Sequence, residues 1–316
     1  MALRTALNHD YQNPHAADQF NTIMKTQLFT LFLGILSLPL FASDEYEKTY
    51  SKNFEVRPNV KLETRSSFGS IDIMPWDKNE VQVDIEIIVE ARSESAAEDI
   101  FEDIEVVLDG DLYRVKVSTE RNGNWSSKNG NKVEINIHIK APENAELNVD
   151  HDFGSSRIGA FGNKAEIQNA FGELEIEQLR HDDCHVTSEY GNARIRHFNG
   201  GELDVQFGSL RVDRLTGNTE INSSYSDTEI NGIEASVESL EVDNEFGSVD
   251  VNLHPEASFA IVGEASFGDV ELPREAVNIK KDKDMMSYDI RGDVGSGKKG
   301  ELIIHSSFGD VDVDVD

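Results

Sequence analysis

The stretch Phe171-Gly172-Glu173-Leu174-Glu175-Ile176 decides the fold, because close copies of it recur along the chain. Each copy has an aromatic residue, a glycine, and then apolar residues that alternate with polar ones. From Phe153 to Phe267 the copies are separated by 18, 19, 17, 18, 21 and 21 residues. A repeat of this length predicts units that bury their apolar faces only by stacking on one another. The copies begin at Phe68, Phe153, Phe171, Tyr190, Phe207, Phe246, Phe267 and Phe308, and Tyr225-Ser226 is a degenerate copy.

A second, weaker half-unit lies between the aromatic-glycine phrases, so the local period is about nine residues, with two half-units in each turn. Short strands and tight turns at this spacing predict an all-β fold, a single-stranded β-solenoid (β-helix) with about 18–21 residues per turn. Glycine and asparagine are expected at corners where the backbone needs positive φ or a tight bend. The half-units include Phe161-Gly162-Asn163, Phe198-Asn199-Gly200, Leu215-Thr216-Gly217 and Ile233-Glu234-Ala235.

The alternation within each copy predicts where its side chains point. We expect the aromatic rings to stack on their equivalents in the coils above and below. The apolar residues expected to point inward are Leu174, Ile176, Ile195, Leu210, Val212, Ile230, Val249 and Val251.

The residue four positions after each aromatic should face outward. In a parallel stack with rungs about 4.8 Å apart, opposite charges in this row should pair across coils. The C-terminal half of the row is acidic, which would oppose end-to-end association. In sequence order the row reads Arg157, Glu175, Arg194, Arg211, Glu229, Asp250 and Glu271.

The first 42 residues are interpreted as a leader. Residues 1–23 are polar and unpatterned, and we interpret them as a non-native upstream extension of a chain that starts at Met24. Residues 24–42 have the layout of a secretory signal peptide, with an apolar run from Leu28 to Phe41 followed by the small residue Ala42.

Residues 43–150 are β-rich without a regular repeat, and we interpret them as a lead-in, or cap, to the regular repeats of residues 151–316. The segment near 94–105 differs, because acidic residues come first and apolar residues follow at helical spacing. With Ser93 as an N-cap candidate, it predicts one short helix. The polar cluster at 122–131 predicts a turn.

The charge of the chain limits its partners. There are 29 Lys and Arg residues against 60 Asp and Glu residues, giving a net charge of -31. Because phosphate binding needs clustered basic residues, this balance excludes nucleic acid. A self-repelling surface favours a monomer, and no stable membrane anchor is expected after removal of the signal peptide. Cys184 is the single cysteine and is expected to be a packing residue.

Four landmarks occur in a distinctive order within residues 45–316. They are the turn Trp76-Asp77-Lys78-Asn79-Glu80 before a Val-rich strand, the helix start SESAAEDI at 93–100, the strand end Ile-x-Ile-x-Ile-Lys-Ala-Pro at 135–142, and the closing Ser306-Ser307-Phe308-Gly309-Asp310-Val311. Together they resemble the bacterial family of exported β-strand-repeat proteins known as "putative adhesins". The chain departs from that family where Phe or Tyr replaces the usual small residue before glycine. The resemblance implies a β-solenoid at the cell envelope and implies no reaction.

Two motifs resemble binding loops without meeting their requirements. Residues 292–298 spell Gly-x4-Gly-Lys, but the Ser or Thr of a phosphate loop is replaced by Lys299, and the segment lies between predicted strands instead of before a helix. We expect a flexible hairpin turn there. Arg291-Gly292-Asp293 spells a cell-attachment tripeptide, which arises often by chance.

Two groups of residues resemble metal ligands. Asp310, Asp312, Asp314 and Asp316 alternate with valine, so they lie along a strand instead of folding around an ion, and only weak surface Ca²⁺ association is expected. The best histidine cluster is His181 and His185 around Asp182 and Asp183, but its spacing does not match that of zinc sites.

We assign no catalytic, cofactor-binding or metal-ligating residue, because no nucleophile–base pair or serine elbow occurs. The sequence favours a non-enzymatic, exported scaffold of the cell envelope, periplasmic or extracellular, that binds a glycan or protein component of the envelope. One alternative is a carbohydrate-active β-helix enzyme, which would need paired carboxylates in a deep groove. Another is a regulatory partner in envelope-stress signalling.

Overall fold

The structure is a computed structural model that describes residues 44–121, 132–284, 286–296 and 299–315. The chain divides into two compact units, Met1–Ala42 and Ser43–Asp316, and every element below belongs to the second. The predicted extension and signal peptide, and the turn at 122–131, lie outside the described residues. In the described part, no helix has the length and apolar character needed to cross a membrane.

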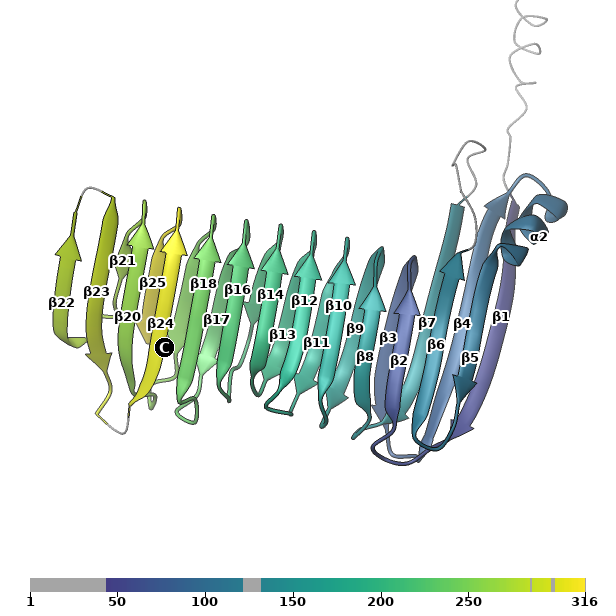
Figure 1. The fold of residues 1–316 in the computed structure, drawn as a ribbon, viewed down its shortest axis with the longest axis horizontal. Coiled ribbons are helices and arrows are strands. Elements are labelled where there is room, and N and C mark those ends of the chain that lie inside the picture. Colours follow the sequence, from purple (N-terminus) through teal and green to yellow (C-terminus); the bar gives the residue numbers. More distant parts are fainter. Residues whose placement is uncertain (1–43, 122–131, 285, 297–298, 316) are drawn as a thin grey trace, which may run out of the picture. The chain divides into compact units, whose positions relative to one another are not determined.

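The strands form two sheets that enclose one apolar core (Figure 1). The 12-stranded sheet has the spatial order β1 (Asp44–Glu55), β4 (Glu80–Ala91), β7 (Lys132–Pro142), β3 (Gly69–Trp76), β9 (Gly154–Phe161), β11 (Leu174–Leu179), β13 (Asn192–Phe198), β15 (Ser209–Val212), β17 (Asp227–Ile233), β19 (Val249–Leu253), β25 (Val311–Val315) and β21 (Val270–Glu271). The 13-stranded sheet has the order β22 (Val277–Lys283), β23 (Ser287–Val294), β20 (Phe259–Ser266), β24 (Gly300–Ser307), β18 (Ser239–Glu245), β16 (Thr219–Ser224), β14 (Gly201–Gln206), β12 (Cys184–Glu189), β10 (Ala165–Ala170), β8 (Glu146–His151), β2 (Lys61–Ser66), β6 (Arg114–Arg121) and β5 (Ile104–Gly110).

Each regular coil contributes one strand to each sheet, which confirms the predicted all-β solenoid. In one coil, β12 leads through the Tyr190-Gly191 turn into β13, and Asn199-Gly200 then leads into β14. Equivalent strands pair in parallel and in register, so Ile176 lies beside Ile195. The eight residues predicted to point inward are all buried, with at most 1% of their surface exposed.

The N-terminal part adds antiparallel strands to this stack. Strand β4 pairs antiparallel with both β1 and β7, and β5 pairs antiparallel with β6. The helix predicted near 94–105 is α2 (Glu94–Glu102), and its N-cap Ser93 accepts a hydrogen bond from the Ala96 amide at 3.3 Å. Strands β2 and β3 already form a coil, because they pair in parallel with β8 and β9.

The last coil in the sequence is not the last coil in the stack. Strand β24 lies between β18 and β20 and is parallel to both. Strand β25 lies in the same way between β19 and β21. The stack ends in an antiparallel hairpin of β22 and β23, seen on the left of Figure 1. The C-terminal strands are therefore inserted between coils that precede them in the sequence.

Candidate binding surfaces

The aromatic residues of the repeated phrase form a continuous stack along one corner of the solenoid. We call it the aromatic ladder. Neighbouring ring centroids are 4.6–5.6 Å apart and the rings are inclined by 1–14°, which confirms the predicted stacking. Seven of its residues each expose 43–58% of their surface. In spatial order the ladder is Phe68, Phe153, Phe171, Tyr190, Phe207, Tyr225, Phe246, Phe308 and Phe267.

Glycine supplies the positive φ in the first two copies of the phrase, at Gly69 and Gly154, as predicted, but not in the later copies. From Phe171 onward, every aromatic of the ladder takes the left-handed conformation itself, with φ between 52° and 62°. The following glycine is needed because successive turns approach each other closely. A Cβ on Gly191 would lie 1.9 Å from the Gly172 carbonyl oxygen, and a Cβ on Gly208 would lie 1.8 Å from that of Gly191. At these two positions only a glycine fits without movement of the backbone.

A polar side chain on the inner face closes many of these turns. Asn169 donates to the Gly172 carbonyl oxygen at 3.1 Å, Ser223 to that of Ser226 at 3.3 Å, and Ser306 to that of Gly309 at 3.0 Å. Each donor stands two residues before the aromatic, so the full pattern is Asn/Ser-x-aromatic-Gly. These donors were not predicted, although the pattern is present in the sequence.

His151 occupies the same inner position in its coil, and only 1% of it is exposed. Its Nδ1 lies 3.0 Å from the Ser156 hydroxyl, which in turn donates to Asn169 at 2.7 Å. Burial lowers the pKa of His151 to about 4, against a smaller opposing effect of the Asp152 charge. The side chain is therefore neutral at pH 7.

The outward charged row exists, but its order and its pairing differ in part from the prediction. Arg157 contacts Glu175 at 3.4 Å, and Arg211 contacts Glu229, as expected. Arg194 lies beside Arg211 in register and instead contacts Asp213 at 2.9 Å. Asp213 thus bridges two like charges, because it also contacts Arg211 at 2.8 Å.

The acidic half of the row has the spatial order Glu229, Asp250, Asp312 and Glu271, not the predicted order in which Glu271 follows Asp250. The inserted strand β25 places Asp312 between them. Partial burial, together with the Glu229 and Asp227 charges, raises the pKa of Asp250. Weak surface Ca²⁺ association stays a prediction; Asp312 and Asp314 face outward there, and Asp316 lies outside the described residues.

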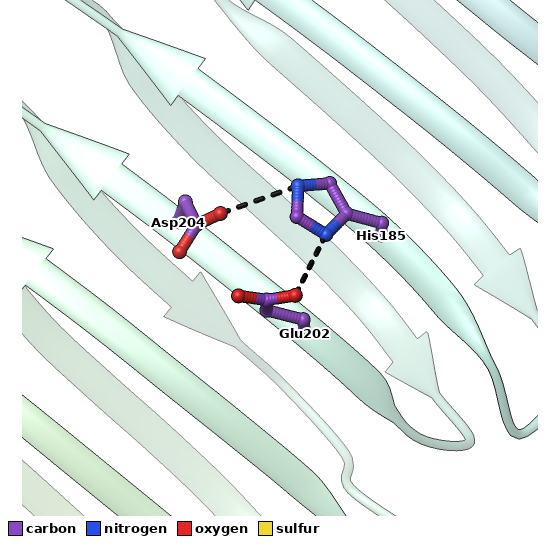
Figure 2. Close-up of side chains that lie close together, drawn as sticks. All are labelled: His185, Glu202 and Asp204. Atoms are coloured by element: carbon purple, nitrogen blue, oxygen red, sulfur yellow. Dashed lines mark hydrogen bonds and ion pairs between the residues drawn. The ribbon is translucent and has the colours of Figure 1, made fainter.

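A cluster of one histidine and two carboxylates lies on the outer face of the 13-stranded sheet (Figure 2). His185 on β12 points toward Glu202 and Asp204, which occupy alternate positions on the neighbouring strand β14. The ring contacts both carboxylates, at 3.0 Å from Nδ1 to Glu202 and at 3.2 Å from Nε2 to Asp204. The predicted partners are elsewhere: Asp183 pairs with Lys164, and His181 contacts Asp182 at 3.6 Å.

The remaining motifs are structural. Arg291-Gly292-Asp293 lies within strand β23, not on a turn, and Asp293 contacts Lys299 at 2.8 Å. That contact lowers the pKa of Asp293. The first three residues of the Gly-x4-Gly-Lys segment at 292–298 belong to strand β23. Residues 297–298 lie outside the described residues. Cys184 is buried, and burial raises the pKa of its thiol to about 11, as expected for a packing residue.

A hollow of about 360 Å³ lies over β3, β9, β11 and β13 and is lined by both apolar and charged side chains. Its two carboxylates, Glu175 and Glu177, are more than half exposed and contact Arg157 and Arg196. Among the described residues, no Asp or Glu is buried. This hollow is not the deep groove with buried, paired carboxylates that a carbohydrate-active enzyme would need.

Several solved structures are similar to this chain at low sequence identity. A "putative adhesin" from Parabacteroides distasonis ATCC 8503 shares 14% identity over 84% of this chain and 97% of its own, with a TM-score of 0.46. A "putative adhesin" from Bacteroides fragilis NCTC 9343 shares 13% over 84% and 97%, with a TM-score of 0.41. A "putative lipid binding protein" from Parabacteroides distasonis ATCC 8503 shares 12% over 84% and 96%, with a TM-score of 0.36.

No curated protein matches the sequence. The predicted family resemblance is nevertheless confirmed, since the Toastrack DUF4097 family model matches residues 59–314, and the chain belongs to that family.

Proposed function

We propose that this protein is an exported, non-enzymatic scaffold of the cell envelope that binds an extended glycan along the aromatic ladder. The observation that carries the proposal is the ladder itself, a row of half-exposed rings that continues from coil to coil. Continuous exposed apolar surface of this kind marks interaction sites in soluble proteins. Export is supported by the signal-peptide pattern of residues 24–42, and fractionation of cells that express the full chain would test it.

Stability alone is a weak reason for the ladder. The left-handed conformation costs a residue with a side chain about 1–2 kcal/mol, and a stacked ring pair returns about 0.5–1.5 kcal/mol. These contributions nearly offset each other, and asparagine or glycine would take the same backbone conformation at lower cost. Repeated selection of Phe and Tyr at exposed positions therefore supports a role for the ring surface in binding.

The surroundings of the ladder favour a glycan over a purely apolar partner. Polar side chains flank the rings on both sides, with Glu189 and Gln206 before them and Asn192 and Ser209 after them. Asn192 and Ser209 are bonded to each other across coils at 2.8 Å. A saccharide chain offers apolar C–H groups to the rings and hydroxyls to these flanking groups, in a repeat that can follow the coils.

The test is a glycan array probed with the purified chain and with a triple variant, Tyr190→Ser, Phe207→Ser and Tyr225→Ser. We expect the wild type to bind extended glycans and the triple variant to lose at least about tenfold in affinity, as for the loss of buried aromatic contacts. Tyr113→Ser is the control, because Tyr113 is 59% exposed and lies outside the ladder.

Equal binding by the wild type and the triple variant would overturn the proposed surface. Absence of binding to any glycan would overturn glycan recognition itself. Thermal unfolding of each variant shows whether a loss of binding reflects a loss of fold.

A further inference from the structure

We propose that His185, Glu202 and Asp204 form a binding site for a divalent transition metal ion of the Zn²⁺ type. This inference is independent of glycan binding, because the three residues lie on the outer face of the 13-stranded sheet and not on the ladder corner (Figure 2). The site joins two consecutive coils, since His185 belongs to β12 and both carboxylates belong to β14.

The register of the two strands creates the cluster. His185 lies beside Glu202, and Thr187 lies beside Asp204, so the imidazole sits between two outward carboxylates. One ligand atom from each of the three residues can be chosen so that all lie within 4.8 Å of one another. Tetrahedral Zn²⁺ with bonds of about 2.0–2.2 Å needs ligand atoms roughly 3.4 Å apart. The two carboxylates contact different nitrogens of the ring, so metal binding requires side-chain rotations that bring both to the same nitrogen. All three groups are partly exposed, which leaves them this freedom.

The ligand types select the ion. One imidazole nitrogen and two carboxylates suit Zn²⁺ and similar transition metals, and the fourth position remains open to water. Ca²⁺ prefers six to eight oxygen ligands, so this group offers it too few. The two negative charges match the charge of the ion.

A neighbouring coil holds the carboxylates in place. Asn222 on β16 donates to Asp204 at 2.9 Å and to Glu202 at 3.4 Å. Supporting contacts of this kind orient metal ligands. Two other histidines provide a contrast within the chain: His138 and His305 each contact a single carboxylate, at 3.7 Å and 3.3 Å. Among the described residues, only the His185 cluster brings three such ligands together.

The experiment is a Zn²⁺ titration of the purified full chain in competition with a chromophoric chelator. We expect one specific site per chain, and we expect His185→Gln and Asp204→Asn each to weaken it by at least about 100-fold. Asn222→Ala should weaken it by about tenfold, the effect of losing a supporting contact. Glu220→Gln is the matched control, because Glu220 lies beside Glu202 on the next coil and its substitution removes the same charge.

The acidic surface gathers cations without any specific site, and the control measures that effect. If Glu220→Gln weakens Zn²⁺ binding as much as Asp204→Asn does, the binding is diffuse and the site is refuted. Equal affinity in the wild type and His185→Gln refutes it as well, as does displacement of Zn²⁺ by equimolar Ca²⁺.

A second measurement needs no substitution in the measured protein. The chain has nine histidines, and their ring nitrogens can be followed by NMR during the titration, with the His185→Gln spectrum used for assignment. The proposal requires the His185 ring signals to shift at one equivalent of Zn²⁺. If these signals stay in place, His185 only contacts the two carboxylates and the metal site is refuted. Unfolding of each variant in the presence of a chelator separates loss of metal binding from loss of fold.

Discussion

His151 is a titratable residue enclosed by the coil, and its surroundings define its protonation. The Ser156 hydroxyl donates its only proton to Asn169. It must therefore be the acceptor in its hydrogen bond with His151, and the donor is the Nδ1–H of His151. The Nε2 atom is buried and has no hydrogen-bond partner among the described residues. A proton on Nε2 would be a buried donor without an acceptor, so the fold selects the neutral Nδ1–H form.

We predict that His151 makes the fold sensitive to mild acid. The unfolded chain binds the proton with a pKa of about 6.5, whereas the folded pKa is about 4. The unfolded state therefore holds more protons between these values, and stability that is complete above pH 6.5 is lost as the pH falls to 4, by roughly 3 kcal/mol. His151→Asn copies the residue at the same position in the next coil, Asn169, and should flatten this dependence.

Urea unfolding of both proteins at pH 7, 5.5 and 4.5 measures the difference. His305→Asn is the control, because His305 is partly exposed on the outer face. Carboxylates contribute to acid sensitivity in all three proteins and cancel in the comparison. Parallel pH profiles for the wild type and His151→Asn would show that His151 does not control this sensitivity.

The His185 cluster shows why candidate ligands were missed from the sequence. Zinc ligands usually lie a few residues apart in the sequence, so Asp182 and Asp183 were the expected neighbours of His185. Glu202 and Asp204 are 17 and 19 residues after His185, which is one coil. In a solenoid the residue one period later is a spatial neighbour. The repeat length thus contained the signal, but only after strand register was fixed could the two carboxylates be assigned to the face of His185.

The aromatic-glycine turn links coils through backbone contact, and this leads to a second stability prediction. Gly191→Ala places a Cβ where the Gly172 carbonyl oxygen already lies, 1.9 Å away. We expect a loss of roughly 2–4 kcal/mol in the free energy of unfolding, because backbone atoms must shift. Denaturant unfolding measures it.

The reverse substitution is the control for this turn. Ser226 is the one residue of the repeated phrase that replaces glycine, and the ring step there, 5.0 Å from Phe207 to Tyr225, exceeds the neighbouring steps of 4.8 and 4.7 Å. We expect Ser226→Gly to change stability by less than about 1 kcal/mol. If Gly191→Ala and Ser226→Gly lower the free energy of unfolding equally, the close approach of successive turns does not determine stability.

The period of the sequence was enough to predict the strands, the buried residues and the ring stack. It did not predict which residue of the turn has positive φ, because glycine is the general choice for that conformation. From Phe171 onward, glycine, or serine at Ser226, occupies the contact position between successive turns and the aromatic residue takes the positive φ. Such a constraint between coils is not visible within one repeat.

The position of the last coil was likewise not predictable from local pattern. Phe308-Gly309 has the same form as the other phrases, and a coil can in principle stack on any other coil. The hairpin of β22 and β23 covers the outer edge of β20, so the last coil finds its place on the inner side, between β18 and β20. Four of its apolar residues are almost completely buried there: Leu302, Ile304, Val311 and Val313.

Removal of the last coil should loosen the end of the stack and leave the middle intact. In a chain truncated after residue 296, we expect amide protection in β20 and β23 to fall by about 100-fold or more, because β20 loses its parallel neighbour. Protection in β10–β14 should be retained, since stability in solenoids comes mainly from neighbouring repeats.

Hydrogen exchange measures both regions, and a peptide of residues 297–316 should restore the lost protection. Unchanged protection in the truncated chain would mean that β20 can stack directly on β18.

The inserted coil also has a consequence for how this protein is made. A solenoid can in general fold coil by coil as it leaves the ribosome. Here that growth can proceed only as far as β19, because β20–β23 emerge before the strand that separates them from β18. Completion of this end must therefore wait until β24 and β25 have been synthesised, and until then β20–β23 lack the strands that join them to the rest of the stack.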